Sequence, residues 1–254
     1  MHRPRRLRRW MTAAGLVVAV ALPALPAVAQ GQRSCQKPCP NAVGTAAMGK
    51  LTAAQKDGLR FMREEEKLAR DVYQALGKKW DHPTFTHIAA AEQRHMDMMG
   101  VMLERYGVED PVGDKAPGVF DNPELQRLYT TLVATGNGSL QDALRAGALV
   151  EETDLDDLYG QLGDKPPADL AQVYEQLARG SRNHLRAYVR VLGSFGSEYA
   201  PKVLDATRFG AIIASDVERG PGMGRGPGMG RGRGQGQGQG MGQGMGQGCD
   251  CKAQ

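Results

Sequence analysis

The residues best suited to chemistry in this sequence are a glutamate and a histidine three positions apart, Glu92 and His95. At this spacing in an α-helix the two side chains lie on one face, one turn apart. The other positions of that face step along the chain by three and four residues and are apolar or aromatic: Phe85, Ile88, Met99, Met102 and Tyr106. Burying a carboxylate and an imidazole in such a stripe is costly without compensation, and for Glu-x-x-His the usual compensation is a metal ion.

Three other segments have the same pattern of an apolar stripe with polar residues at its centre. These central residues are Glu66 within 51–76, Glu151 within 140–162, and Ser181 with His184 within 169–192. Three carboxylates and two imidazoles at similar depth would form a buried acidic cluster, which without a cation would have to take up protons or water. The economical interpretation is a carboxylate–histidine metal site within a bundle of four helices.

The chain between these segments indicates where helices begin and end. Thr52 is expected to cap the first helix, and Gly77 is expected to end it. Residues 107–120 are rich in glycine and proline and predict a loop, after which Pro123 opens a short helix over 124–135. The expected fold is therefore all-α, a four-helix bundle with an extra short helix between the second and third long helices.

Three acidic neighbours of the central residues offer further oxygens. Glu65 shares a second face with apolar residues of its helix, Glu152 adjoins Glu151, and Asp154 lies one turn beyond Glu151. Carboxylate and imidazole ligands suit iron or manganese, with zinc as a further candidate. The expected metal ligands are Glu66, Glu92, His95, Glu151 and His184, with Glu65, Glu152 and Asp154 as secondary candidates.

Four phrases of the sequence carry a resemblance to known proteins. They are EEEKLARDVY (64–73), AEQRHM (91–96), VEETDLDDL (150–158) and GSRNHLRAY (180–188). The overall pattern resembles the ferritin-like di-iron carboxylate superfamily, and the first phrase is similar to the first-helix signature of rubrerythrins. Residues 50–192 more closely resemble an uncharacterised ferritin-like domain family of bacteria and archaea, a prokaryotic domain of unknown function. The resemblance implies a ferritin-like fold but no established reaction.

The resemblance also implies roles for individual residues. Glu66 and Glu151 take the positions of the lone glutamates, and Glu92 with His95 takes the first Glu-x-x-His and would bridge two metals. His184 takes the histidine of the second motif, but Ser181 stands where that motif has glutamate. We therefore expect weaker metal binding on the His184 side, unless Asp154 or Glu65 supplies the missing carboxylate.

These residues leave three functions open. The first is an exported metal-binding protein with a mono- or di-iron site, or manganese in its place, that oxidises ferrous ion or reduces peroxide, with oxygen or peroxide as its partner. The second is a non-enzymatic protein that buffers or senses metal in the cell envelope. The third is a metal-free interaction module, in which Arg70 or Arg94 would hold the buried acids.

The two ends of the chain differ in composition from the helical part. Residues 1–29 combine a basic start, a short apolar run and Ala27-Val28-Ala29, as in a cleaved secretory signal. The apolar run is too short to span a membrane, so we expect export to the periplasm or the extracellular space and no transmembrane segment after cleavage. The residues from Gly220 onward are mostly Gly, Met, Gln and Arg and predict a disordered tail.

The expected organisation has five parts: a signal peptide (1–29), a flexible leader (30–49), a helical domain (50–197), a weakly structured extension (198–219) and a disordered tail (220–254). Two cysteines, Cys35 and Cys39, lie in the leader, and two, Cys249 and Cys251, lie in the tail. In an exported protein we expect these cysteines to form disulfides, with the pairing left open.

The charge balance argues against a nucleic-acid partner. The formal net charge is +4, but the signal peptide alone contributes five arginines and no acidic residue. The helical domain is then mildly acidic and only the tail is basic, which is not typical of a nucleic-acid-binding domain. The sequence has no pattern of a nucleophile triad or a phosphate-binding loop, so a hydrolase or kinase function is poorly supported. Oligomerisation is left open.

Overall fold

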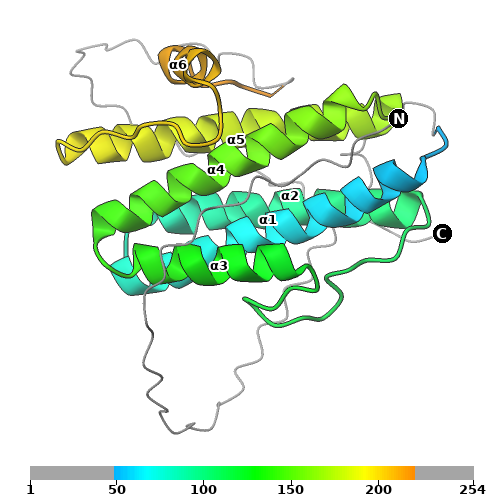
Figure 1. Ribbon diagram of the computed structural model, residues 1–254, viewed down its shortest axis with the longest axis horizontal. Helices are drawn as coiled ribbons and strands as arrows, with labels where there is room; N and C mark the ends of the chain where they lie inside the picture. The colour runs from blue at the N-terminus through cyan, green and yellow to red at the C-terminus, as the bar shows by residue number, and fades with distance from the viewer. Residues whose placement is uncertain (1–48, 221–254) are drawn as a thin grey trace, which may run out of the picture. The chain divides into compact units, whose positions relative to one another are not determined.

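The computed structural model of the protein describes residues 49–220, and within them the chain forms helices and no strand (Figure 1). The helices are α1 (Ala53–Trp80), α2 (Pro83–Arg105), α3 (Pro123–Gly136), α4 (Leu140–Gly163), α5 (Ala168–Ser194) and α6 (Ala206–Ala214). The four long helices are α1, α2, α4 and α5, and the shorter α3 separates the second from the third. The predicted all-α bundle with an extra short helix at this position is therefore confirmed.

The long helices pack as two pairs, α1 against α2 and α4 against α5. Contacts of α1 with α4 and of α2 with α5 join the pairs, α3 lies against α1 and α4, and α6 lies beside α5 (Figure 1). The shared core consists of stripe residues with no exposed surface, among them Leu59, Met99, Leu144 and Leu177. Within the described residues, no helix combines the length and apolar character needed to cross a membrane.

The first helix begins at its predicted cap but continues past its predicted end. The Thr52 side chain accepts a hydrogen bond from the Gln55 N–H, and the Gln55 side chain accepts one from Thr52, which is a capping box. Gly77 does not end α1, which continues to Trp80 with Asp81 as its left-handed cap. Gly77 instead allows the start of α2 to approach, because a Cβ there would lie 3.1 Å from Cβ of Phe85.

The loop between α2 and α3 is held against α1 by charged residues of the phrase EEEKLARDVY (64–73). Glu64 accepts a hydrogen bond from the backbone N–H of Asp121. Lys67, only 1% exposed, donates to the carbonyl of Ala116 and forms an ion pair of 2.6 Å with Asp71. These residues therefore hold the loop and are directed away from the bundle's centre.

Residues 198–219, expected to be weakly structured, contain α6 and are fastened to α4 and α5. Glu152 on α4 accepts hydrogen bonds from the backbone N–H groups of residues 202–204. Glu218 forms an ion pair of 2.5 Å with Arg182 on α5. Tyr199, Leu204 and Ile212 of this segment are also buried in the core, so apolar packing and these polar contacts together hold it in place.

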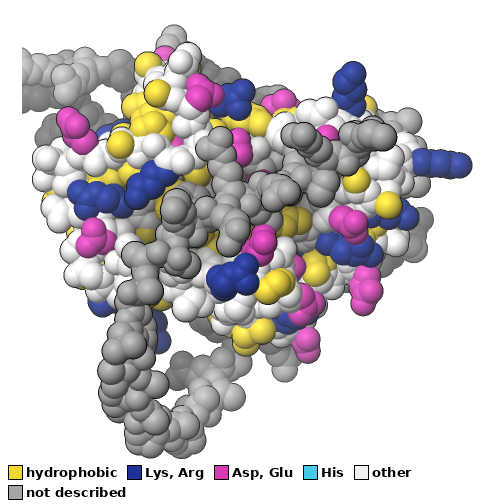
Figure 2. Space-filling view, viewed as in Figure 1, with side chains coloured by type: hydrophobic (Ala, Val, Ile, Leu, Met, Phe, Trp, Pro, Cys, Tyr) yellow, Lys and Arg dark blue, Asp and Glu magenta, His cyan; other side chains and the backbone are white. Residues whose placement is uncertain are grey.

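Acidic and basic side chains of the described residues are interspersed on the face drawn in Figure 2, with apolar side chains between them. The predicted signal peptide, the tail beyond Gly220 and the four cysteines lie outside the described residues, as does nearly all of the predicted leader.

Candidate metal centre

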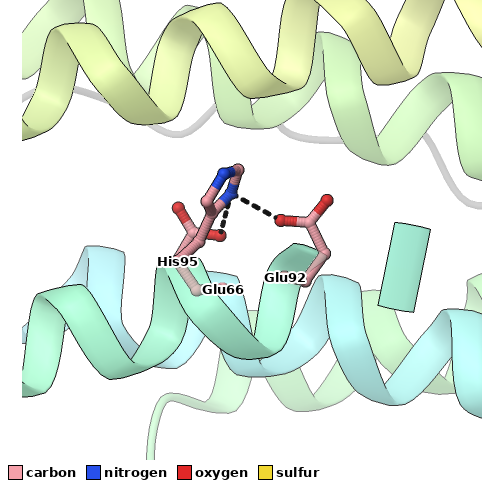
Figure 3. A group of neighbouring side chains, drawn as sticks. All are labelled: Glu66, Glu92 and His95. Atoms are coloured by element: carbon pink, nitrogen blue, oxygen red, sulfur yellow. Dashed lines mark ion pairs between the residues drawn. The ribbon is translucent and has the colours of Figure 1, made fainter. Parts of the chain in front are cut away.

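The five expected ligands come from all four long helices and meet in the core of the bundle. Glu66 belongs to α1, Glu92 and His95 to α2, Glu151 to α4, and His184 to α5. The three glutamates are at most 2% exposed, and His95 is 9% exposed. Figure 3 shows Glu66, Glu92 and His95 directed together from α1 and α2 toward the facing pair of helices.

Glu92 lies at the middle of the arrangement and belongs to two groups of potential ligands. One group contains Glu66 and His95, the other contains Glu151 and His184, and within each group the ligand atoms lie within 4.8 Å of one another. The two carboxylate oxygens of Glu92 are divided between the groups. Its Oε2 lies 2.8 Å from Nδ1 of His95, and its Oε1 lies 2.7 Å from Nδ1 of His184.

The outer glutamates repeat this geometry on the two sides of Glu92. Oε2 of Glu66 lies 3.4 Å from Nδ1 of His95, and Oε2 of Glu151 lies 3.5 Å from Nδ1 of His184. The two imidazole rings are stacked, with their centroids 5.7 Å apart. The centre is therefore two similar Glu–His halves that share one carboxylate.

Several atoms of the centre are buried without a hydrogen-bond partner, which tests whether a metal fits. They are Oε1 of Glu66 and three atoms that meet one another or Glu92 only in the ion pairs described above, namely Oε1 of Glu92 and Nδ1 of both histidines. Leaving such atoms unpaired in the core is unfavourable, and buried polar groups are normally satisfied. Carboxylate oxygens with imidazole nitrogens are donors that iron, manganese and zinc accept, so a cation in each half would satisfy these atoms.

Burial and neighbouring charges shift the pKa values of the centre in opposite directions. Burial raises the pKa of Glu66 to about 7, although His95 beside it acts to lower it. Burial would also raise the pKa of Glu92, but the charges of His184 and His95 outweigh it and hold that pKa far below its usual range. Burial would lower the pKa of His184, yet Glu92 and Glu151 raise it to about 10. A cation that enters would displace protons from these groups.

Two further residues, Tyr73 and Gly180, position members of the two groups, and for Gly180 a close approach to a neighbouring helix was expected. The hydroxyl of Tyr73 donates to Oε1 of Glu151 at 2.5 Å, which orients that carboxylate. Gly180 leaves space for His95, because a Cβ at this position would lie 2.6 Å from its Nε2. Tyr73 lies on the same stripe as Glu66, seven residues further along, and that spacing is the signal that could have found it.

Ser181 and Asp154 pair with each other and belong to neither group. The Ser181 hydroxyl donates to Oδ2 of Asp154 at 2.5 Å, while Oδ1 of Asp154 has no hydrogen-bond partner. Ser181 is 1% exposed, so it is inward-facing as the stripe predicted. In this structure Asp154 does not replace the carboxylate that Ser181 lacks.

The other two secondary candidates also lie outside both groups. Both oxygens of Glu152 are used by the C-terminal segment, because Tyr199 donates to Oε2 at 2.5 Å in addition to the backbone N–H groups. Glu65 lies next to Asp157 and Asp154, and Oε2 of Glu65 has no hydrogen-bond partner.

The arginines required by the metal-free alternative are occupied elsewhere. Arg70 forms an ion pair of 2.7 Å with Asp71 and donates to the side chain of Gln93. Arg94 donates to the carbonyl of Ala90 at 2.8 Å. These contacts of Arg70 and Arg94 are therefore with residues outside the two groups of potential ligands.

The fold and the site define a helical bundle with a carboxylate–histidine cluster in its core, and comparison with known proteins gives the family. Residues 55–216 match a family described as "Uncharacterized protein domain (DUF2202)". The chain is 45% identical over 170 residues to the uncharacterised protein MJ0754 of Methanocaldococcus jannaschii, which covers 67% of this chain and 92% of that protein. This protein therefore belongs to the DUF2202 family, a domain of unknown function, as its sequence phrases predicted.

A solved structure is similar to the same part of the chain. It is the crystal structure of the hypothetical protein MJ0754 from Methanococcus jannaschii DSM 2661, with a TM-score of 0.68 and 43% sequence identity. The alignment covers 69% of this chain and 100% of that chain.

Proposed function

We propose that this protein binds two divalent metal ions, iron or manganese, in the core of its ferritin-like bundle. Glu66 and His95 would hold one ion, Glu151 and His184 would hold the other, and Glu92 would bridge them. The observation that carries this proposal is the division of the two Glu92 oxygens between two histidines, at 2.8 Å and 2.7 Å. Each half of the centre therefore has one oxygen of Glu92, as a carboxylate that bridges two ions would require.

The chemistry that we propose is redox chemistry toward a small oxidant. Iron bound by two or three protein ligands keeps open coordination positions and supplies one-electron chemistry toward oxygen or peroxide. The protein's contribution is to hold the two halves together through Glu92, to orient Glu151 through Tyr73 and to exclude bulk water by burial. Ferrous ion would be the reductant and would be oxidised to ferric ion, while oxygen or peroxide would take up the electrons and be reduced.

A second function, buffering or sensing of metal without turnover, is favoured by Ser181. The neutral hydroxyl at this position donates to Asp154, so the His184 half has one carboxylate fewer than the superfamily pattern. Oxygen consumption after ferrous ion is added to the purified protein separates the two functions. If the protein has the redox function, oxygen should be consumed only when the protein is present. If it has the buffering function, it should bind ferrous ion without consuming oxygen.

Metal content tests the proposal itself. Elemental analysis after dialysis should give up to two equivalents of iron or manganese per chain in the parent and none in Glu92→Ala, which removes the bridge. Glu104→Ala is the matched control, since Glu104 is an exposed glutamate of the same helix and its loss should leave the metal content unchanged. A parent without metal, or a Glu92→Ala variant that keeps it, would contradict the proposal.

A further inference from the structure

A line of acidic side chains lies beside the metal centre and outside both ligand groups. Glu65 on α1 shares a side-chain hydrogen bond with Asp157 on α4, and it lies close enough to Asp154 and Glu66 for their charges to interact. Asp154 in turn interacts with Glu66 and Glu151. Glu65 is 2% exposed and Asp154 is 4% exposed, whereas Asp157 is partly exposed. The line therefore leads from the surface of the bundle to its buried centre.

Two oxygens of this line are buried and have no hydrogen-bond partner, Oε2 of Glu65 and Oδ1 of Asp154. Their sequence neighbours differ in this respect. Glu64 accepts hydrogen bonds that hold the loop before α3, and Glu152 accepts hydrogen bonds that hold the C-terminal segment. Glu64 and Glu152 are therefore buried because they accept hydrogen bonds that hold a loop or a segment in place. No such contact accounts for the unpaired oxygens of Glu65 and Asp154.

The acidic line is not arranged as a third metal site. Within the described residues, the groups with three ligand atoms inside 4.8 Å of one another are the two halves of the centre, and neither includes Glu65, Asp154 or Asp157. Carboxylate oxygens that do not converge on one point suit a cation that passes, because each one replaces part of its hydration shell in turn without trapping it. The buried centre needs such a route, because Glu66 and Glu92 are at most 2% exposed.

We propose that Asp157, Glu65 and Asp154 form the access path by which a divalent cation passes from solvent to the metal centre. The inference rests on the proposed metal-binding function. In it, these residues determine how fast the metal enters the centre and do not change the final affinity for the metal. Asp157 would attract the hydrated ion at the surface, and the unpaired oxygens of Glu65 and Asp154 would carry it inward to Glu66.

The test is the rate at which the metal-free full-length protein takes up Co²⁺, followed by its visible absorption in a stopped-flow instrument. Glu65→Gln and Asp157→Asn should each load on the order of 10-fold more slowly than the parent and reach the same number of equivalents. Asp156→Asn is the matched control, because Asp156 is the exposed residue next to Asp157 and loses the same charge. It should load at the parent rate.

The outcomes separate this inference from the proposed function. Parent loading rates in both Glu65→Gln and Asp157→Asn would overturn the access path and leave the metal centre intact. A loss of bound Co²⁺ in Glu65→Gln would make Glu65 a ligand and would also overturn the path. A parent that takes up no Co²⁺ would overturn the proposed function together with the inference. Thermal unfolding of each variant shows whether it is folded, and Asp157→Asn, at a partly exposed position, keeps the test valid if Glu65→Gln unfolds.

Discussion

The imidazole of His95 lies against the backbone of α5 at Gly180, where an added Cβ would come within 2.5 Å of Cε1 and 2.6 Å of Nε2. The glycine lowers the helix propensity of α5, yet it provides the space in which this ligand stands. At the scale of single residues, the centre therefore depends on a missing side chain as well as on those present.

We predict that Gly180→Ala displaces His95 and lowers metal affinity in its half of the centre by at least about 10-fold. Gly193→Ala is the matched control in the same helix, since nothing lies within 4 Å of its Cβ position. There the substitution should keep the metal and raise the free energy of unfolding by about 0.5–1 kcal/mol. Competition titration with a chelating dye and thermal unfolding measure the two effects. Unchanged affinity in Gly180→Ala would show that His95 does not bind metal in this position.

Tyr73 provides a second residue-scale prediction, because its hydroxyl donates to Oε1 of Glu151. Tyr73→Phe should weaken metal binding in the Glu151–His184 half by about 10–100-fold, as expected when a supporting hydrogen bond to a ligand is lost. Tyr174→Phe is its control, since the buried hydroxyl of Tyr174 has no hydrogen-bond partner. The same dye titration applies, and equal affinities in the two variants would contradict a supporting role for Tyr73.

At the scale of elements, consecutive residues of one helix serve different neighbours. Glu64 holds the loop before α3, Glu65 faces α4, and Glu66 faces the centre. On α4, Glu151 likewise faces the centre while Glu152 holds the C-terminal segment. Successive positions on a helix are 100° apart, so a run of acids necessarily reaches several partners.

We predict that Glu152→Ala releases the C-terminal segment and leaves the metal centre intact. Removing this acceptor leaves the N–H groups of residues 202–204 unpaired, and because that of Leu204 is buried the cost should be about 1–3 kcal/mol. Amide hydrogen exchange over residues 199–214 should accelerate, and metal content should equal that of the parent. Glu198→Ala, at an exposed position of the same segment, is the control and should change neither. Loss of metal in Glu152→Ala would instead make Glu152 a ligand.

At the scale of the whole molecule, the spacing of apolar residues along the sequence predicted the features that follow from helical geometry. The stripes through Glu66, Glu92 and Glu151 predicted which faces of the long helices point inward, and the five expected ligands do lie together. This holds because the stripe of each helix must face the common core. Whether the centre holds metal is still a prediction.

The sequence could not predict features that depend on what lies opposite a residue. Gly77 carries the signal of a helix end, but it is a point of close approach to Phe85. Glu152 was a secondary candidate for metal binding, but it accepts hydrogen bonds from the C-terminal segment. The helix α6 within residues 198–219 was missed for the same reason, since side-chain contacts to α4 and α5 hold that segment.

The most direct test of the account is anomalous diffraction from crystals of the full-length protein grown with Mn²⁺. The account predicts two peaks in the core of the bundle, one bounded by Glu66, Glu92 and His95 and the other by Glu92, Glu151 and His184. The peak beside His184 is expected to have the lower occupancy, because Ser181 supplies no carboxylate there. A core without anomalous density, or density that avoids Glu92, would contradict the account.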